Sequence, residues 1–155
     1  MTAHIPVETL REWMASDDPL LHHLAFHTAF GHPETVDGLE EDERLDLLLH
    51  FLDEGLSGRY GESIPDGPYV LGHTVLGWLQ QLTASDDPGA RNALARVMQL
   101  LERLARQGDP ATRDVLVLGI LEHAFADDRT RALFEPWASD PELSALYDEA
   151  RRLSA

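Results

Sequence analysis

Histidines are the residues whose type and spacing come closest to a metal site in this sequence. There are eight, and four of them fall in the cluster His22–His32. Within it His23 and His27 are four residues apart, which places both on one face of a helix. A carboxylate such as Glu34 or Asp37 would complete a site for a divalent ion. The alternative is that these histidines are ordinary polar surface residues, and we expect no metal and no cofactor.

Other patterns that support catalysis are missing from the sequence. Cysteine is absent, which excludes thiol nucleophiles and cysteine–zinc sites. A zinc-protease helix has a glutamate directly after its first histidine, and this chain has Leu24 there. The sequence contains neither a Gly-x-Ser-x-Gly nucleophile turn nor a glycine-rich phosphate loop. We therefore expect no catalytic residues and a protein that is not an enzyme.

Glu122 is the carboxylate with the least ordinary surroundings, because it directly follows the apolar run Val115–Leu121. A carboxylate buried beside such a run has to be hydrogen-bonded, for example to an arginine or to a helix N-terminus, since an isolated buried charge is costly. We expect Glu122 to be a buried structural clamp between helices.

The charge of the chain is strongly negative. Its 155 residues include 28 Asp and Glu against 12 basic residues, all of them arginine, for a net charge of −16. Residues 1–77 hold fifteen of the acids and three arginines, whereas residues 78–155 hold thirteen acids and nine arginines. Such a field repels nucleic acid and anionic membranes and attracts basic proteins. Acidity of this kind can also serve solubility alone.

The densest negative charge lies at the start of an expected helix, where five acids fall between Glu40 and Asp46. Acids at this position complement the helix dipole, and they also form a candidate patch for a basic partner. In a nearby loop Arg59 precedes Tyr60, and both residue types are common anchors of protein interfaces. The expected partner-binding residues are Glu40, Glu41, Glu43, Asp46, Arg59 and Tyr60.

An Asp-Pro pattern marks the helix starts and occurs at Asp18-Pro19, Asp87-Pro88, Asp109-Pro110 and Asp140-Pro141. Aspartate accepts hydrogen bonds from the free N–H groups of the first turn, and proline at the first helical position has no N–H to leave unbonded. With the apolar periodicity, this pattern predicts helices at about residues 7–15, 19–30, 39–56, 69–82, 88–106, 110–125, 128–137 and 141–153.

The expected fold is all-α, with about eight helices in stacked antiparallel pairs that form either a short α-solenoid or an irregular bundle. We expect no strand. The length predicts a single domain over residues 1–155, in which a loop at residues 57–68 separates the acidic N-terminal half from the C-terminal half. No apolar stretch reaches the roughly 18 residues that span a membrane, and no signal peptide is evident, so we expect a cytoplasmic protein.

Two segments carry a resemblance to a known family. Leu71–Leu79 reads LGHTVLGWL, and Asp114–Glu122 reads DVLVLGILE, with an amphipathic helix between them and an acidic helical tail after them. Over residues 69–150 the chain resembles small all-helical bacterial immunity proteins of polymorphic toxin and contact-dependent inhibition loci. The resemblance implies binding and neutralisation of a cognate toxin, and it assigns no functional residue to this sequence.

These observations support three functional hypotheses. The first is an acidic inhibitory protein that occludes a basic bacterial toxin, because a toxic nuclease binds phosphate and carries the opposite charge. The second is an α-solenoid-like scaffold for protein interactions. The third is a metal-binding protein or metal-dependent enzyme that uses the histidines of the cluster His22–His32.

Overall fold

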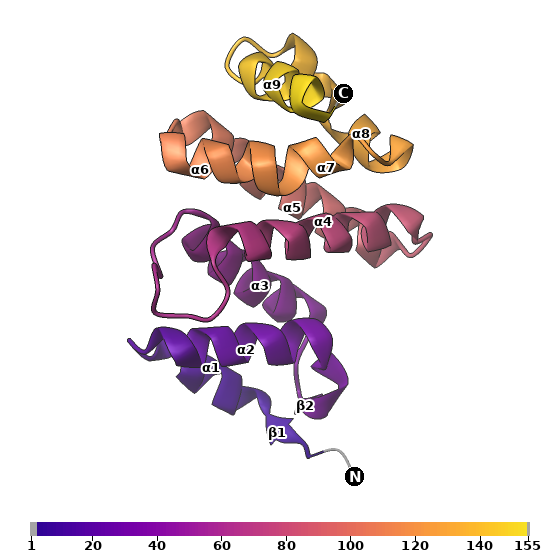
Figure 1. The fold of residues 1–155 in the computed structure, drawn as a ribbon. Helices are drawn as coiled ribbons and strands as arrows, with labels where there is room; N and C mark the ends of the chain where they lie inside the picture. Colours follow the sequence, from indigo (N-terminus) through magenta and orange to yellow (C-terminus); the bar gives the residue numbers. More distant parts are fainter. Residues whose placement is uncertain (1–2, 155) are drawn as a thin grey trace. The chain divides into compact units, whose positions relative to one another are not determined.

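The computed structural model describes residues 3–154, and most of that range is helical, which confirms the all-α expectation (Figure 1). The chain divides into two compact units. The N-terminal unit runs to Gly55 and includes Arg59–Pro65, and the C-terminal unit consists of Leu56–Gly58 and the chain from Asp66 onward. The division falls at the loop where the sequence analysis separates two halves. Within the described range, no helix has both the length and the apolar character needed to cross a bilayer.

The N-terminal unit is built around stacked aromatic rings. Its helices are α1 (Val7–Ala15), α2 (Pro19–Gly31), the short 3₁₀ helix η1 (Pro33–Thr35) and α3 (Glu41–Leu56). Phe26 of α2 stacks on Phe51 of α3 with ring centres 4.5 Å apart, and Phe51 stacks in turn on Tyr60 at 5.1 Å. All three rings are buried, so the aromatic side chains join α2, α3 and the loop that follows α3.

A very short parallel sheet, which was not predicted from the sequence, pairs the segment before α1 with the segment after η1. Strand β1 (Ile5–Pro6) pairs with β2 (Val36–Asp37). A hydrogen bond of 3.1 Å between His4 Nδ1 and Asp37 Oδ1 lies beside the pair. Strands of two residues are too short to show an alternating apolar pattern, which is why the sequence gives no sign of them.

The C-terminal unit contains the remaining helices. They are α4 (Pro68–Ala84), α5 (Pro88–Gln107), α6 (Pro110–Val115), the π-helix η2 (Leu116–Leu121), α7 (Glu122–Ala124), α8 (Asp128–Phe134), the 3₁₀ helix η3 (Glu135–Ser139) and α9 (Ser144–Ser154). Helix α4 packs against α5 and η2, and α9 packs against η2, α7 and η3. The π-helix is therefore covered from more than one side.

Aspartate caps start the helices where the Asp-Pro pattern predicts them. The side chains of Asp18, Asp87 and Asp109 each accept a hydrogen bond from the backbone N–H two residues further on. Asp140 accepts from the N–H groups of the second and third residues after it, but α9 begins only at Ser144. Residues 141–143 form turns instead, so the prediction of a helix from residue 141 is three residues early.

The predicted helix at residues 110–125 is not a regular α-helix. Its centre, η2, is a π-helix, which is wider than an α-helix and contains an extra residue. Five of its six residues are buried, and the exception, Leu118, is 39% exposed. This agrees with the apolar, non-amphipathic sequence of the segment, which indicates burial on most sides.

Two glycines allow α4 and η2 to approach closely. A Cβ atom placed on Gly72 of α4 would lie 3.3 Å from the Cα of Gly119 in η2 and 3.4 Å from its carbonyl atoms. Both glycines are buried in helices. Any side chain at Gly72 would therefore press on backbone, which cannot move aside without separating the two helices.

We expect Gly72→Ala to lower the free energy of unfolding by about 1–2 kcal/mol. The added Cβ overpacks the contact between α4 and η2, and this cost outweighs the gain of up to about 1 kcal/mol in helix propensity. Gly77→Ala is the matched control on the same helix, since a Cβ there meets nothing within 4 Å. It should raise stability by about 0.5–1 kcal/mol. Urea unfolding of both variants measures the difference, and equal effects would contradict the account.

Candidate functional site

A shallow groove between α1 and α3 in the N-terminal unit combines charged and apolar lining residues. It has a volume of about 300 Å³. Its lining residues come from both helices, and they are Arg11, Met14, Glu43, Asp46, Leu47 and His50. Two of the predicted acidic residues, Glu43 and Asp46, are among them. The apolar side chains of Met14 and Leu47 add contact surface that the charge pattern alone does not reveal.

A two-bonded salt bridge joins the two helices that form the groove. Arg11 of α1 donates from Nε and Nη2 to the two carboxylate oxygens of Glu43 on α3, at 2.7 and 2.8 Å. The hydrogen bonds from Arg11 and its positive charge lower the pKa of Glu43, so this carboxylate stays ionised. Glu43 therefore has a structural role as a salt-bridge partner. The sequence predicted only a partner-binding role for it.

The other predicted acids at the start of α3 lie at the surface, and one of them, Glu41, binds an arginine. Arg44 donates to Glu41 at 3.2 Å, and it also donates from Nε to the carbonyl of Ala29 at 2.7 Å near the end of α2. Glu40 and Asp46 are exposed. The acidic start of α3 is thus partly neutralised by arginine, and the charge that remains at the surface is less than the five acids predict.

The expectation that Tyr60 is an exposed interface anchor is wrong. Its side chain is buried, 8% exposed, and its hydroxyl lies 3.0 Å from Nδ1 of His22, whose Nε2 donates to the carbonyl of Ser16 at 2.6 Å. Burial, with a smaller contribution from the charge of Glu54, raises the pKa of Tyr60 to about 12. The glycine-rich loop suggests exposure, but the stack on Phe51 draws the ring inward.

Arg59 is exposed, as the sequence analysis expects, but it is occupied within the same unit. Its Nη1 donates to Glu54 at 2.8 Å, and its backbone N–H donates to the Glu54 carbonyl. Arg59 therefore links the end of α3 to the loop that follows it. Tyr69, which is 46% exposed at the start of α4, is the tyrosine that the structure leaves at the surface.

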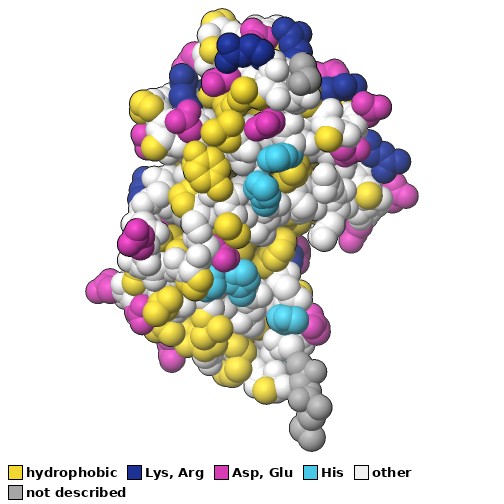
Figure 2. Space-filling view, viewed as in Figure 1, with side chains coloured by type: hydrophobic (Ala, Val, Ile, Leu, Met, Phe, Trp, Pro, Cys, Tyr) yellow, Lys and Arg dark blue, Asp and Glu magenta, His cyan; other side chains and the backbone are white. Residues whose placement is uncertain are grey.

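His23 and His27 do lie on one face of α2, with ring centres 4.3 Å apart. Neither carboxylate suggested as a third ligand belongs to the pair, since Glu34 lies 3.8 Å from His32 and Asp37 bonds to His4. Figure 2 shows histidine side chains at the surface in small separate groups, with hydrophobic side chains nearby. The pair stays a candidate for metal binding by its spacing alone.

Glu122 is half-buried, so the prediction of a fully buried clamp is wrong. The residue lies at the first position of α7, where the π-helix ends. The extra residue in the π-helix changes the direction in which the following residues face, relative to a regular helix. The apolar run before Glu122 therefore does not give the burial of Glu122 itself.

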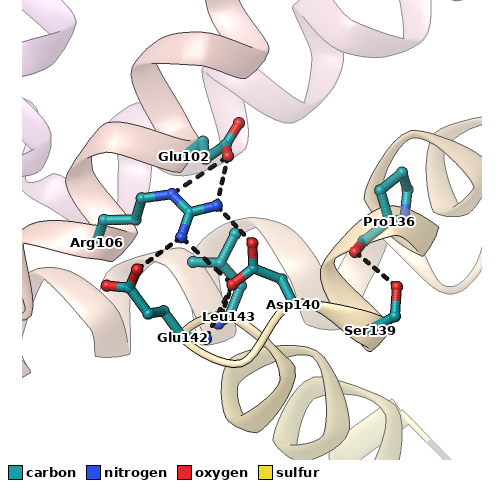
Figure 3. Close-up of polar contacts among 7 residues, drawn as sticks. All are labelled: Glu102, Arg106, Pro136, Ser139, Asp140, Glu142 and Leu143. Atoms are coloured by element: carbon teal, nitrogen blue, oxygen red, sulfur yellow. Dashed lines mark hydrogen bonds and ion pairs between the residues drawn. The ribbon is translucent and has the colours of Figure 1, made fainter.

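Arg106 is the centre of a charge network that joins α5 to the segment before α9. It binds Glu102 on its own helix and both Asp140 and Glu142 from the segment before α9 (Figure 3). These bonds hold the pKa of Asp140 below its ordinary range, because Arg106 and backbone N–H groups stabilise the ionised form. A general acid needs the opposite shift.

A second hollow lies beside this network, and its volume of about 190 Å³ is below the size usual for small-molecule sites. Its lining residues are Met98, Glu102, Leu133, Pro136, Trp137, Asp140 and Leu143. Both of its carboxylates are bound to Arg106. The hollow therefore offers no carboxylate poised for acid–base chemistry.

We expect Asp140→Asn to lower the thermal midpoint at pH 7, because the variant loses the charge that pairs with Arg106 but keeps a helix-capping oxygen. The folded-state pKa of Asp140 lies below its ordinary 3.8. Its stabilisation is therefore complete above that value and is lost as the pH falls through the lowered pKa. The gap between wild type and variant should close in acid.

Thermal melts at pH 7 and at a series of values below about 4 measure this gap. Asp148→Asn is the control, since Asp148 forms only an exposed pair of 3.4 Å with Arg151 on the same helix. A gap for Asp140→Asn that stays constant down to pH 2 would show that the charge is not the cause.

Comparison with known proteins does not place the chain in a family, because no family model, curated protein or solved structure matches it significantly. The function has to be argued from the groove, the charges and the contacts described above.

Proposed function

We propose that this chain is a binding protein, not an enzyme, and that the α1–α3 groove receives a basic segment of a protein partner. The groove carries the proposal, because it brings exposed Asp46 together with Met14 and Leu47 in one hollow of about 300 Å³. A segment with cationic and apolar side chains satisfies both kinds of surface. Interfaces of this composition, with an apolar centre and charged surroundings, are typical of protein partners.

The charge of the whole N-terminal unit favours a cationic partner. The unit contains fourteen acidic residues and three arginines. Each of the three arginines is bound to a carboxylate of the same unit, Arg11 to Glu43, Arg44 to Glu41 and Arg59 to Glu54. The long-range field is therefore negative, and it accelerates encounter with a basic protein more than it adds to the final affinity.

Three carboxylates have lowered pKa values that suit structural roles. Asp127, Asp140 and Glu43 all have lowered pKa values, each because hydrogen bonds and arginine charge stabilise the ionised form. Catalytic acids are held in the opposite state by burial or by neighbouring negative charge. These three carboxylates are thus suited to holding helices together.

Within this class, an immunity protein against a basic bacterial toxin is the specific function we propose. The sequence resemblance over residues 69–150 implies it, and the acidity of the N-terminal unit is consistent with it, because toxins that act on nucleic acid carry basic surfaces to bind phosphate. The mechanism is occlusion: the partner's cationic surface is covered and its substrate is excluded. Such a protein works in the cytoplasm, where the toxin's target lies.

A site-specific photo-crosslinker tests where a partner binds. Placed at Asp46 in the groove, it should form a covalent product with a basic protein in the native host. The same group at Glu149, an exposed residue of α9, should give none. A toxin domain encoded beside this chain's gene is the expected product. Products formed equally at both positions, or only at α9, would overturn the groove assignment.

Association kinetics with the purified, crosslink-identified partner test the charge argument. Raising NaCl from about 20 to 300 mM should slow association by more than about tenfold, because the encounter is steered by charge. Asp46→Arg should slow it at low salt, whereas Glu149→Arg should change it by less than about twofold. A rate that ignores salt contradicts the mechanism, and a partner bound through an apolar surface alone identifies a general interaction scaffold instead.

A further inference from the structure

A second histidine pair lies in the C-terminal unit, between residues fifty positions apart in the sequence. The rings of His73 on α4 and His123 on α7 have centres 4.9 Å apart, with an angle of 64° between the ring planes. Both side chains are exposed. Sequence spacing could not have identified the pair, because its members come from different helices and only the packing of α4 on η2 and α7 brings them together.

The distance between the rings matches joint coordination of one metal ion. Imidazole nitrogens bind zinc at about 2.0–2.1 Å, and two such rings at a tetrahedral angle have centres about 5 Å apart. The observed 4.9 Å fits this value without movement of either helix. Side-chain rotation about the Cβ bonds, which is free at the surface, is sufficient to direct one nitrogen of each ring at the ion.

The histidine pair lies beside the close approach of α4 and η2 at Gly72 and Gly119. His73 directly follows Gly72, and His123 lies four residues after Gly119, which is about one turn. Because the two glycines set the separation of α4 and η2, they also set the distance between the two histidines. The two backbones are therefore already in place, and an ion that binds here has to order only the two imidazole side chains.

The π-helix contributes the orientation of His123. An extra residue in η2 rotates everything after it by roughly 100° relative to an uninterrupted α-helix. His123 is the second residue after this segment. Turns of π-helix are uncommon and are frequent at functional sites, which gives a reason for this irregularity other than core packing.

We propose that His73 and His123 form a binding site for a divalent transition ion, with zinc as the expected occupant. Two neutral imidazoles and no thiolate suit zinc, copper and nickel better than calcium or magnesium. The exposure of both rings leaves the remaining coordination positions to water or to a group from a partner. This site is separate from the α1–α3 groove, and its failure would leave the proposed function untouched.

Zinc titration of protein produced without a histidine tag tests the site. Calorimetry should show one zinc site that is retained in the double variant His23→Gln/His27→Gln. This variant removes the other close pair of histidines. His73→Gln and His123→Gln should each weaken that site by at least about tenfold, because a single imidazole remains. His32→Gln is an exposed single-histidine control and should change nothing.

Copper supplies a second readout that does not depend on affinity. Pulsed electron paramagnetic resonance of Cu²⁺-loaded His23→Gln/His27→Gln protein should show two coordinated imidazoles, and adding His73→Gln should reduce them to one. Circular dichroism checks that each variant is folded. Zinc binding that disappears in His23→Gln/His27→Gln, or that is unaffected by His73→Gln and His123→Gln, would overturn the proposal.

Discussion

The excess of negative charge is the constraint under which this fold is built. A chain with 28 acidic residues and 12 arginines repels itself when it becomes compact. The structure places arginines where separate segments meet. Arg11 connects α1 to α3, Arg44 connects α3 to the end of α2, and Arg106 connects α5 to the segment before α9. Each of these arginine contacts supplies an attraction at a place where two elements lie close together.

Four of the acids also cap helices within the fold. Asp18, Asp87, Asp109 and Asp127 accept hydrogen bonds from backbone N–H groups at helix starts. Capping needs an oxygen acceptor and benefits from negative charge, so aspartate is well suited to it. The charge available to an external partner lies on exposed acids, which include Asp46 in the α1–α3 groove and Glu40 directly before α3.

The local chemistry of helix starts could be predicted from the sequence, because an Asp-Pro pair acts on the few residues that follow it. The failures have a different cause. Tyr60 is buried because an aromatic stack formed by distant residues outweighs the exposure that its glycine-rich loop suggests. Glu122 is less buried than its apolar neighbours indicate, because a π-helix shifts the facing of the residues after it. Both results depend on tertiary packing, which propensity and periodicity do not contain.

The two candidate sites differ in how much of each can be predicted from the sequence, again because tertiary packing brings distant residues together. The acids of the groove, Glu43 and Asp46, lie three residues apart on α3 and can be found by counting charge, but its apolar lining residues Met14 and Leu47 come from two helices and are found only in the structure. The pair formed by His73 and His123 leaves no trace in the spacing. Its geometry depends on Gly72 and Gly119, which the sequence shows only as two glycines in apolar segments.

The groove and the histidine pair differ in the physics by which they would recognise a ligand, and this difference makes them separable. The field of the N-terminal unit acts over about 8 Å at physiological ionic strength and weakens as salt is added. Coordination by imidazole acts at about 2 Å and responds to ligand geometry far more than to salt. A ligand effect that depends on ionic strength therefore indicates the acidic surface. An effect that depends on the identity of the metal indicates the pair formed by His73 and His123.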